Sequence, residues 1–176
     1  MEHKEVKAII GLGNPGPAYF LHRHNIGFLV LDELVRRSGG AWQSKELFDI
    51  AEIHLNFKKI LCIKPKTFMN TSGKVIPFLQ KQGIKPEQIL VVHDELEKPF
   101  GSLAIKFAGS AKGHNGLRSI IGICGDQFYR LRFGIGRPER KEDVGDYVLS
   151  KFTEGNDAVE TEIDKALALI ENLLNN

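Results

Sequence analysis

Residues 6–16 read Val-Lys-Ala-Ile-Ile-Gly-Leu-Gly-Asn-Pro-Gly. The apolar run from Val6 to Leu12 predicts a buried strand, and residues 13–16 predict the turn that ends it. From Asn25 to Arg37 apolar residues recur at helical spacing, and Ser-Gly-Gly at 38–40 is a helix stop. A strand that leads through a polar turn into an amphipathic helix is the first unit of an α/β fold.

Strands and helices mix along the rest of the chain as well. Alternation over 47–57, followed by an apolar run over 60–64, predicts an antiparallel hairpin that turns at 57–59. Further strands are expected at 88–93, 103–107 and 129–135, and further helices at 117–123 and 157–174. Another helix is expected at 73–82, where Pro77 predicts a kink or a late start. The strand at 129–135 alternates Arg with Leu and Phe, which predicts that it is half exposed. Since neither a linker nor a repeat interrupts this pattern, we expect one α/β domain over residues 1–176 with a mixed sheet.

Two His-Asn pairs, Arg23-His24-Asn25 and Gly113-His114-Asn115-Gly116, indicate where chemistry takes place. Imidazole titrates near neutrality, and a carboxamide both donates and accepts hydrogen bonds. Open α/β folds bind ligands at the carboxyl edge of the sheet, so polar motifs at strand ends are expected to gather there. We expect Asn25 to serve the start of its helix. In the second pair we expect Asn115 to belong to the site and His114 to support the loop.

His24 and Asp94 are the best candidates for an acid/base pair. Asp94 follows an apolar strand, where a rigidly held carboxylate would fix the imidazole tautomer and stabilise the imidazolium. An isolated histidine is more often a surface or satisfied core residue. Here Asn14 and Asn70 also lie at predicted element ends, and together with the second His-Asn pair they favour a site. No G-x-S-x-G motif is present, so we expect a water nucleophile activated by His24.

Two other kinds of site fit the sequence poorly. Residues 11–16 match the G-x-G-x-x-G fingerprint of dinucleotide-binding folds, but Pro15 removes one N–H and the next strand comes only near residue 47. Asp94-Glu95 and Glu97 offer carboxylates to a metal, but no H-x-x-H or H-E-x-x-H motif accompanies them. We therefore expect neither a cofactor nor a metal.

Charge is distributed unevenly, although the net charge is only +2. Residues 98–141 hold nine Lys/Arg against two acids, and residues 142–176 hold nine acids against two lysines. This asymmetry predicts a cationic face for a polyanionic partner, the alternative being ion pairing between the two stretches. Residues 109–113 (Gly-Ser-Ala-Lys-Gly) form either a phosphate cradle with Lys112 or a flexible loop. The cations Lys106, Arg130, Arg132 and Arg137, which lie around this loop in the sequence, favour phosphate contacts.

Composition indicates a soluble globular protein, since 42% of residues are hydrophobic and 26% are charged. Met1 to Glu5 lack the apolar core of a signal peptide, and no apolar run approaches the roughly 20 residues that span a bilayer. Cys62 and Cys124 lie in apolar surroundings without a C-x-x-C spacing, which favours reduced thiols over a disulfide or a zinc site. We therefore expect a cytoplasmic protein.

Five segments together resemble the bacterial peptidyl-tRNA hydrolase family, and their order and spacing make the resemblance specific. They are Gly11-Leu-Gly-Asn-Pro-Gly16, Arg23-His-Asn-Ile-Gly27, Lys66-Thr-Phe-Met-Asn70, His93-Asp-Glu-Leu96 and Gly113-His-Asn-Gly-Leu-Arg118. The resemblance implies a monomeric single domain with a twisted mixed sheet flanked by helices and no metal requirement. It also implies hydrolysis of the ester between a peptide and the 3′ end of tRNA, which frees the tRNA for reuse.

The resemblance assigns roles residue by residue. His24 would be the catalytic base and Asp94 its orienting partner. Substrate-binding positions would be Asn14, Tyr19, Phe68, Asn70 and Asn115, and tRNA phosphate would be bound by Lys106 and Arg132. The sequence departs from the family pattern at His22, at Lys112 and in its short carboxyl-terminal region. A non-catalytic RNA-binding module and a nucleotide-dependent enzyme are the rival functions.

Overall fold

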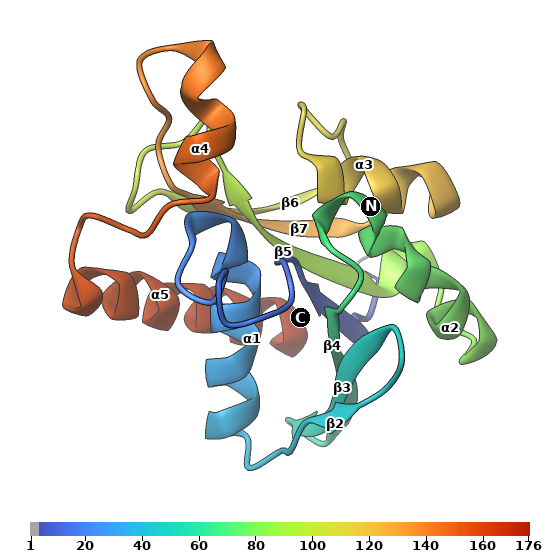
Figure 1. The fold of residues 1–176 in the computed structure, drawn as a ribbon. Helices are drawn as coiled ribbons and strands as arrows, with labels where there is room; N and C mark the ends of the chain where they lie inside the picture. Colours follow the sequence, from blue (N-terminus) through green and yellow to red (C-terminus); the bar gives the residue numbers. More distant parts are fainter. Residues whose placement is uncertain (1–3) are drawn as a thin grey trace.

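The protein is described from a computed structural model that covers residues 4–176, so Met1 to His3 of the amino-terminal stretch lie outside the described residues. One mixed sheet with the strand order β2-β3-β4-β1-β5-β7-β6 forms its centre (Figure 1). The strands are β1 (Ala8–Gly11), β2 (Gln43–Ser44), β3 (Phe48–Leu55), β4 (Lys58–Pro65), β5 (Ile89–Glu95), β6 (Leu103–Phe107) and β7 (Tyr129–Gly134). The α-helices are α1 (Ile26–Arg37), α2 (Ile76–Lys81), α3 (Asn115–Cys124), α4 (Val144–Val148) and α5 (Asn156–Asn175). Four short 3₁₀ helices complete the elements: η1 (Arg23–Asn25), η2 (Met69–Val75), η3 (Pro86–Gln88) and η4 (Lys141–Asp143).

Strand direction brings the predicted polar motifs to one edge of the sheet. β1 pairs in parallel with β4 and β5, and β5 pairs in parallel with β7. The carboxyl ends of these four strands therefore lie at the same edge. The β3–β4 and β6–β7 pairs are antiparallel, which confirms the mixed sheet.

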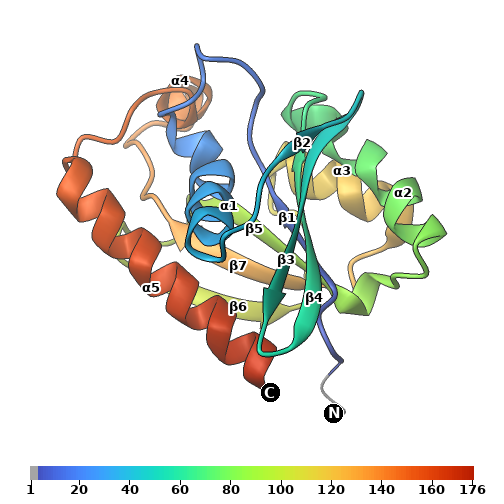
Figure 2. The same cartoon turned by 90° about the horizontal axis from the view of Figure 1, so that it is seen from below.

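Helices cover both faces of the sheet (Figure 2). One face packs under α1 and α5, where Val30, Leu34 and Ile170 contact a core that includes Ile9 and Leu131. The other face packs under α2 and α3, around residues such as Ile10, Leu79 and Ile120. Neighbouring residues of β1 serve opposite faces, as the two-residue period of a strand requires, and all four residues of β1 are buried.

Glycines let α1 pack directly on the end of β1. A Cβ placed on Gly11 would lie 2.4 Å from the carbonyl oxygen of Gly27, and one on Gly27 would lie 2.4 Å from Leu12 N and from Val92 O. The chain after Gly16 does not enter a helix, because the next helical segment begins only with η1. The G-x-G-x-x-G match therefore reflects close packing, and the geometry of a dinucleotide-binding turn is absent.

Two sequence expectations about the elements are wrong in detail, and one is confirmed. The hairpin turns at Asn56 and Phe57, which both adopt positive φ, so β4 begins at Lys58, before the predicted residue 60. The late start expected at Pro77 is confirmed, because residues 69–75 form η2 and α2 begins only at Ile76, with Pro77 in its first turn, where its missing N–H costs nothing. β7 is buried, because it lies between β5 and β6 and is covered; Arg130 is only 3% exposed.

Beyond β7 the chain leaves the body of the protein. Residues 136–149, which include α4, project from it before the chain returns into α5 (Figure 1). We call residues 136–149 the α4 projection. Within the described chain, every helix is too short or too polar to cross a membrane.

Candidate functional site

Three side chains meet at the carboxyl edge of the sheet. His24 comes from η1, Asp94 from the end of β5, and His114 from the residue that precedes α3. His24 Nδ1 lies 2.8 Å from one carboxylate oxygen of Asp94, and His114 Nε2 lies 2.8 Å from the other. The predicted contact between His24 and Asp94 is therefore present, and Asp94 joins two imidazoles.

Hydrogen bonds to His114 define which nitrogens carry protons. The backbone N–H groups of Gly116 and Leu117 both donate to His114 Nδ1, so this nitrogen presents its lone pair and the ring caps α3. His114 Nε2 must then carry the proton that it donates to Asp94. His114 supports the loop through Nδ1, as expected, and its Nε2 also donates to Asp94, which was not expected.

Electrostatics keep Asp94 ionised. Burial acts to raise the pKa of Asp94, but its attraction to His24 and its contact and hydrogen bonds with His24 and His114 outweigh it, and the pKa lies well below its ordinary value of 3.8. Burial likewise acts to lower the pKa of His24, but attraction to Asp94 and the hydrogen bond outweigh it, and that pKa is raised above 6.5. An anionic Asp94 accepts the Nδ1–H of His24, so His24 Nε2 presents the lone pair of a general base.

Asn14 and Asn25 form a reciprocal clamp beside His24. The Asn14 N–H donates to Asn25 Oδ1 at 2.9 Å, and Asn25 Nδ2 donates to the Asn14 carbonyl oxygen at 2.8 Å. The prediction that Asn25 serves the helix start was wrong, because its side chain makes no capping bond to α1. Asn14 Oδ1 accepts from Met69 N–H at 2.8 Å, which leaves Asn14 Nδ2 as the group that can donate to a ligand.

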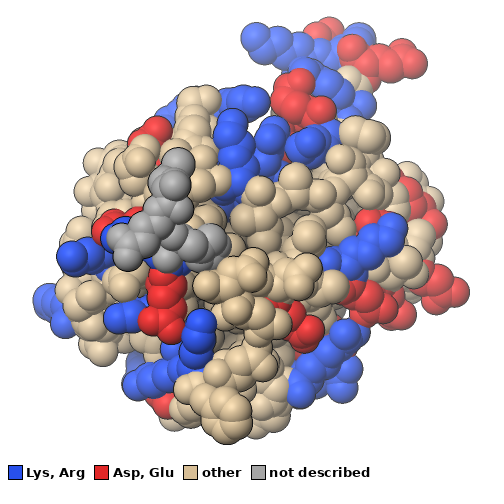
Figure 3. Space-filling model, turned by 180° about the vertical axis from the view of Figure 1, so that it is seen from behind, with Lys and Arg blue, Asp and Glu red and all other residues tan. Residues whose placement is uncertain are grey.

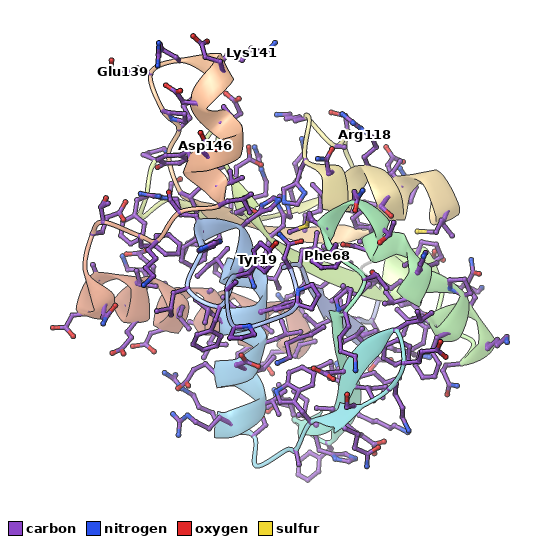
Figure 4. All side chains as sticks on the ribbon, in the orientation of Figure 1. Tyr19, Phe68, Arg118, Glu139, Lys141 and Asp146 are labelled. Carbon is purple, nitrogen blue, oxygen red and sulfur yellow. The ribbon has the colours of Figure 1, made fainter. Side chains whose placement is uncertain are left out.

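Tyr19 and Phe68 lie together next to this clamp (Figure 4), with ring centroids 6.2 Å apart. Phe68 is 52% exposed and holds a positive φ of 60°, which is costly for a non-glycine residue. Side-chain hydrogen bonds between Thr67 and Thr71 hold this turn. His22 also contacts Tyr19 edge-on, with ring centroids 5.6 Å apart.

The other two predicted amides are exposed. Asn70 lies in η2 directly after Met69, whose N–H is held by Asn14. Asn115 is the first residue of α3, and its Oδ1 accepts a long bond of 3.4 Å from Arg118. Both side chains therefore remain accessible at the edge where His24 and His114 meet.

Lys106 and Arg132 line one small pocket, together with Lys112 and Arg130. Lys and Arg side chains gather at the base of the α4 projection on the face shown in Figure 3. Arg132 donates to Glu95 at 3.2 Å. Arg130 is buried and donates to the carbonyl oxygens of Gly109 and Ser110, so it shapes the loop, contrary to the expectation that it contacts phosphate directly.

Ion pairing does not explain the charge asymmetry of the chain. Among residues 4–176, ion pairs that join the basic stretch 98–141 to the acidic stretch 142–176 are limited to Arg140 with its neighbours Glu142 and Asp143. Among residues 4–176, Lys106 and Lys112 make no ion pair and remain available to a partner, whereas Arg132 pairs with Glu95.

His24, Asp94 and His114 also offer three potential metal ligands within 4.8 Å of one another. The hydrogen bonds of His114 disfavour that use, because its Nε2 carries a proton while Nδ1 accepts two backbone N–H groups. Binding a metal through Nε2 would break that arrangement.

Sequence reasoning gave no site role to His93, which is buried behind Asp94. Its Nδ1 lies 2.8 Å from the Asp94 carbonyl oxygen, and its ring contacts His114 edge-on. Burial, followed by the neighbouring His114 ring, lowers the pKa of His93 to about 4, so it is neutral at pH 7. The only signal in the sequence was its position next to Asp94.

Known proteins share both the sequence and the fold of this chain. The peptidyl-tRNA hydrolase family is matched over residues 8–176. The chain is 43% identical over 163 residues to peptidyl-tRNA hydrolase from Rubrobacter xylanophilus, covering 92% of both chains. It is 42% identical over 165 residues to that of Aquifex aeolicus, covering 92% of this chain and 85% of the relative. A crystal structure of a single-residue mutant of peptidyl-tRNA hydrolase from Acinetobacter baumannii matches with a TM-score of 0.94 and 35% identity, covering 99% of this chain and 91% of the other.

Proposed function

This chain belongs to the peptidyl-tRNA hydrolase family, and on that premise we propose that it hydrolyses the ester between a peptide and the 3′-terminal ribose of tRNA by a His24-activated water. The observation that carries the mechanism is the 2.8 Å contact between His24 Nδ1 and Asp94 at the carboxyl edge of the sheet. The products are a free peptide and a tRNA that can be used again.

His24 acts as base and then as acid. Its Nε2 takes a proton from water as the water oxygen attacks the ester carbonyl carbon. Asp94 stabilises the imidazolium that forms, and the tetrahedral intermediate carries the negative charge on the former carbonyl oxygen. When the ester C–O bond breaks, the imidazolium returns the proton to the 3′ oxygen of the ribose. The step consumes one water and needs neither a metal nor a cofactor.

The amides position the substrate in this proposal. Asn14 Nδ2 is the best-placed donor, because Asn14 Oδ1 is held by Met69 N–H and the side chain cannot turn without losing that bond. Asn70 and Asn115 are exposed on the two sides of the edge and bind the peptide backbone or the attacking water. Tyr19 and Phe68 provide an aromatic surface for the 3′-terminal nucleotide, since bases stack on exposed rings.

Lys106 and Arg132 bind tRNA phosphate. Each phosphate that the protein neutralises releases counterions, so binding should weaken as salt rises. Lys106→Ala and Arg132→Ala should each weaken tRNA binding and reduce the slope of log affinity against log salt by about one per lost contact. The test is the salt dependence of tRNA binding, with the exposed Lys81→Ala on α2 as control. An unchanged slope in both variants would remove these residues from the tRNA surface.

The decisive experiment is release of peptide from purified N-blocked aminoacyl-tRNA, with unblocked aminoacyl-tRNA as the comparison substrate. His24→Ala should lower turnover about 10²–10⁴-fold while tRNA binding survives. A folded His24→Ala protein with wild-type turnover would refute the assignment of the base. Binding of tRNA without any ester cleavage by the wild-type protein would favour the non-catalytic RNA-binding alternative.

We place this activity in the cytoplasm, in a monomer with one domain over residues 1–176. Both cysteines are free, and burial raises the pKa of Cys62 to about 12, which keeps its thiol unreactive. The site is assembled from one chain, since His24, Asp94 and His114 meet without a second copy. Sedimentation at micromolar concentration tests the monomer.

A further inference from the structure

Arg23 directly precedes the proposed base, and its side chain is buried. Only 4% of the residue is exposed, and none of the ion pairs among residues 4–176 involves it. Burying a guanidinium without a carboxylate costs free energy that a well-packed apolar side chain would not. Stability therefore does not explain why an arginine occupies this position.

Every hydrogen bond of the Arg23 guanidinium goes to one segment, residues 147–153. Nη1 donates to Ser150 Oγ and, at 3.3 Å, to the Tyr147 carbonyl oxygen, and Nη2 lies 3.5 Å from Thr153 Oγ1. The guanidinium carbon also lies 4.0 Å from the centre of the Tyr147 ring, within the range of a cation–π contact.

The backbone on both sides of this contact is paired as well. Arg23 N–H donates to the Ser150 carbonyl oxygen at 2.9 Å, and His22 forms an isolated antiparallel β-bridge with Lys151. Residues 147–149 of this segment are the end of the α4 projection, and residues 150–153 continue the chain from it. Tyr147 closes the base of that projection, because its hydroxyl donates to the Ile135 carbonyl oxygen at 2.6 Å.

His24 therefore lies between two anchors. On one side Arg23 ties η1 to residues 147–153, and on the other side Asn25 ties it to Asn14 by two hydrogen bonds. η1 has only three residues, so a displacement of either anchor displaces the backbone that carries the imidazole. A misplacement of about 1 Å in a catalytic group can cost on the order of 10²-fold in rate.

We propose that Arg23 is a positioning residue for the proposed base: by tying η1 to residues 147–153 it holds the imidazole of His24 on Asp94 with Nε2 directed at the ester. This inference rests on the proposed function. Arg23 takes no part in the proton transfers of the proposed reaction. Arg23 affects the reaction through the position of His24, and hence through the His24–Asp94 hydrogen bond.

The test compares Arg23→Met, Arg23→Lys and the control Arg36→Met, an exposed arginine on α1 that pairs with Glu33. We expect Arg23→Met to fold, because Ser150 Oγ still donates to the Tyr147 carbonyl oxygen at 2.6 Å. Its kcat should fall about 10–100-fold with KM within about threefold, and Arg23→Lys should be intermediate. Arg36→Met should match the wild type.

A second measurement needs no substrate. In ¹⁵N-histidine NMR titrations, the pKa of His24 should fall in Arg23→Met, because a loosened bond to Asp94 no longer raises it. A folded Arg23→Met with wild-type kcat, or with reduced kcat but an unchanged His24 titration, would overturn the inference. Should Arg23→Met fail to fold, Ser150→Ala removes one acceptor while Arg23 stays, and the same two readouts decide. Absence of ester hydrolysis in the wild type would refute the proposed function and leave the titration as an independent result.

Discussion

Replacing Asp94 with Asn is the sharpest test of the proposed mechanism, because the hydrogen bonds define what the substitution does. The Asn side chain has one acceptor oxygen and one donor NH₂ group in place of two acceptor oxygens. His114 Nε2 must keep its proton, since its Nδ1 accepts from Gly116 and Leu117 N–H. The Asn oxygen therefore has to face His114, and its NH₂ group has to face His24 Nδ1.

His24 then changes tautomer. With Nδ1 accepting from the amide, the proton moves to Nε2, and the lone pair that the base needs is lost. Both hydrogen bonds survive in neutral form, so the protein should fold, with a loss of at most roughly 2 kcal/mol in the free energy of unfolding. The rate should fall about 10²–10⁴-fold, which corresponds to roughly 3–5 kcal/mol in activation free energy.

The assay is kcat for peptide release from N-blocked aminoacyl-tRNA, with Asp157→Asn, an exposed residue in the first turn of α5, as the matched control. In the wild type kcat/KM should rise with pH through the raised pKa of His24, above 6.5, because the base must lose its proton. Nitrogen chemical shifts of His24 report the tautomer directly. A folded Asp94→Asn protein with kcat within about threefold of the wild type, and with His24 still protonated at Nδ1, would refute the reasoning.

Three further predictions concern stability and metal dependence. The pKa of His93 is lowered from 6.5 to about 4, so its neutral form stabilises the fold above pH 6.5, and that contribution, up to roughly 3 kcal/mol, is lost as pH falls towards 4. The free energy of unfolding of His93→Gln, measured in urea, should therefore depend less on pH over this range than that of the wild type. An equal pH dependence would contradict the assignment. Gly27→Ala should lower the free energy of unfolding by about 1–3 kcal/mol or more, because its Cβ would lie 2.4 Å from backbone atoms. In the control Gly122→Ala on α3, the new Cβ meets nothing within 4 Å, so that change should be neutral or stabilising. Equal melting temperatures of the two variants would show that α1 can move aside. Exhaustive chelation should leave turnover unchanged, because His114 Nε2 is a donor to Asp94 and is not free to bind a metal. A loss of turnover that added zinc restores would show instead that these residues bind a metal.

Strand and helix periodicity predicted most elements of the fold. β6 lies at the predicted residues, and α1 and α5 begin or end within a residue or two of their predicted bounds. The hairpin, the mixed sheet and the gathering of polar motifs at the carboxyl edge are likewise confirmed. Burial of β7 could not be predicted, because alternation of Arg with apolar residues looks the same in an edge strand and in a covered one. Only the order of the sheet, with β7 between β5 and β6, decides it.

The candidate site, like the fold, was predicted in part from the sequence and decided in part by tertiary packing. The residue types of His24, Asp94 and Asn14 and their places at element ends follow from the sequence, because imidazole, carboxylate and carboxamide are the groups that such chemistry requires. Which groups touch depends on contacts over 11 to 70 residues of chain, and those are decided by packing. Tertiary structure therefore assigned Asn25 to the clamp on Asn14 instead of a helix cap, and joined His114 to Asp94. It also buried Arg23 against residues 147–153, 124 or more residues away in the chain, a contact that no local pattern encodes.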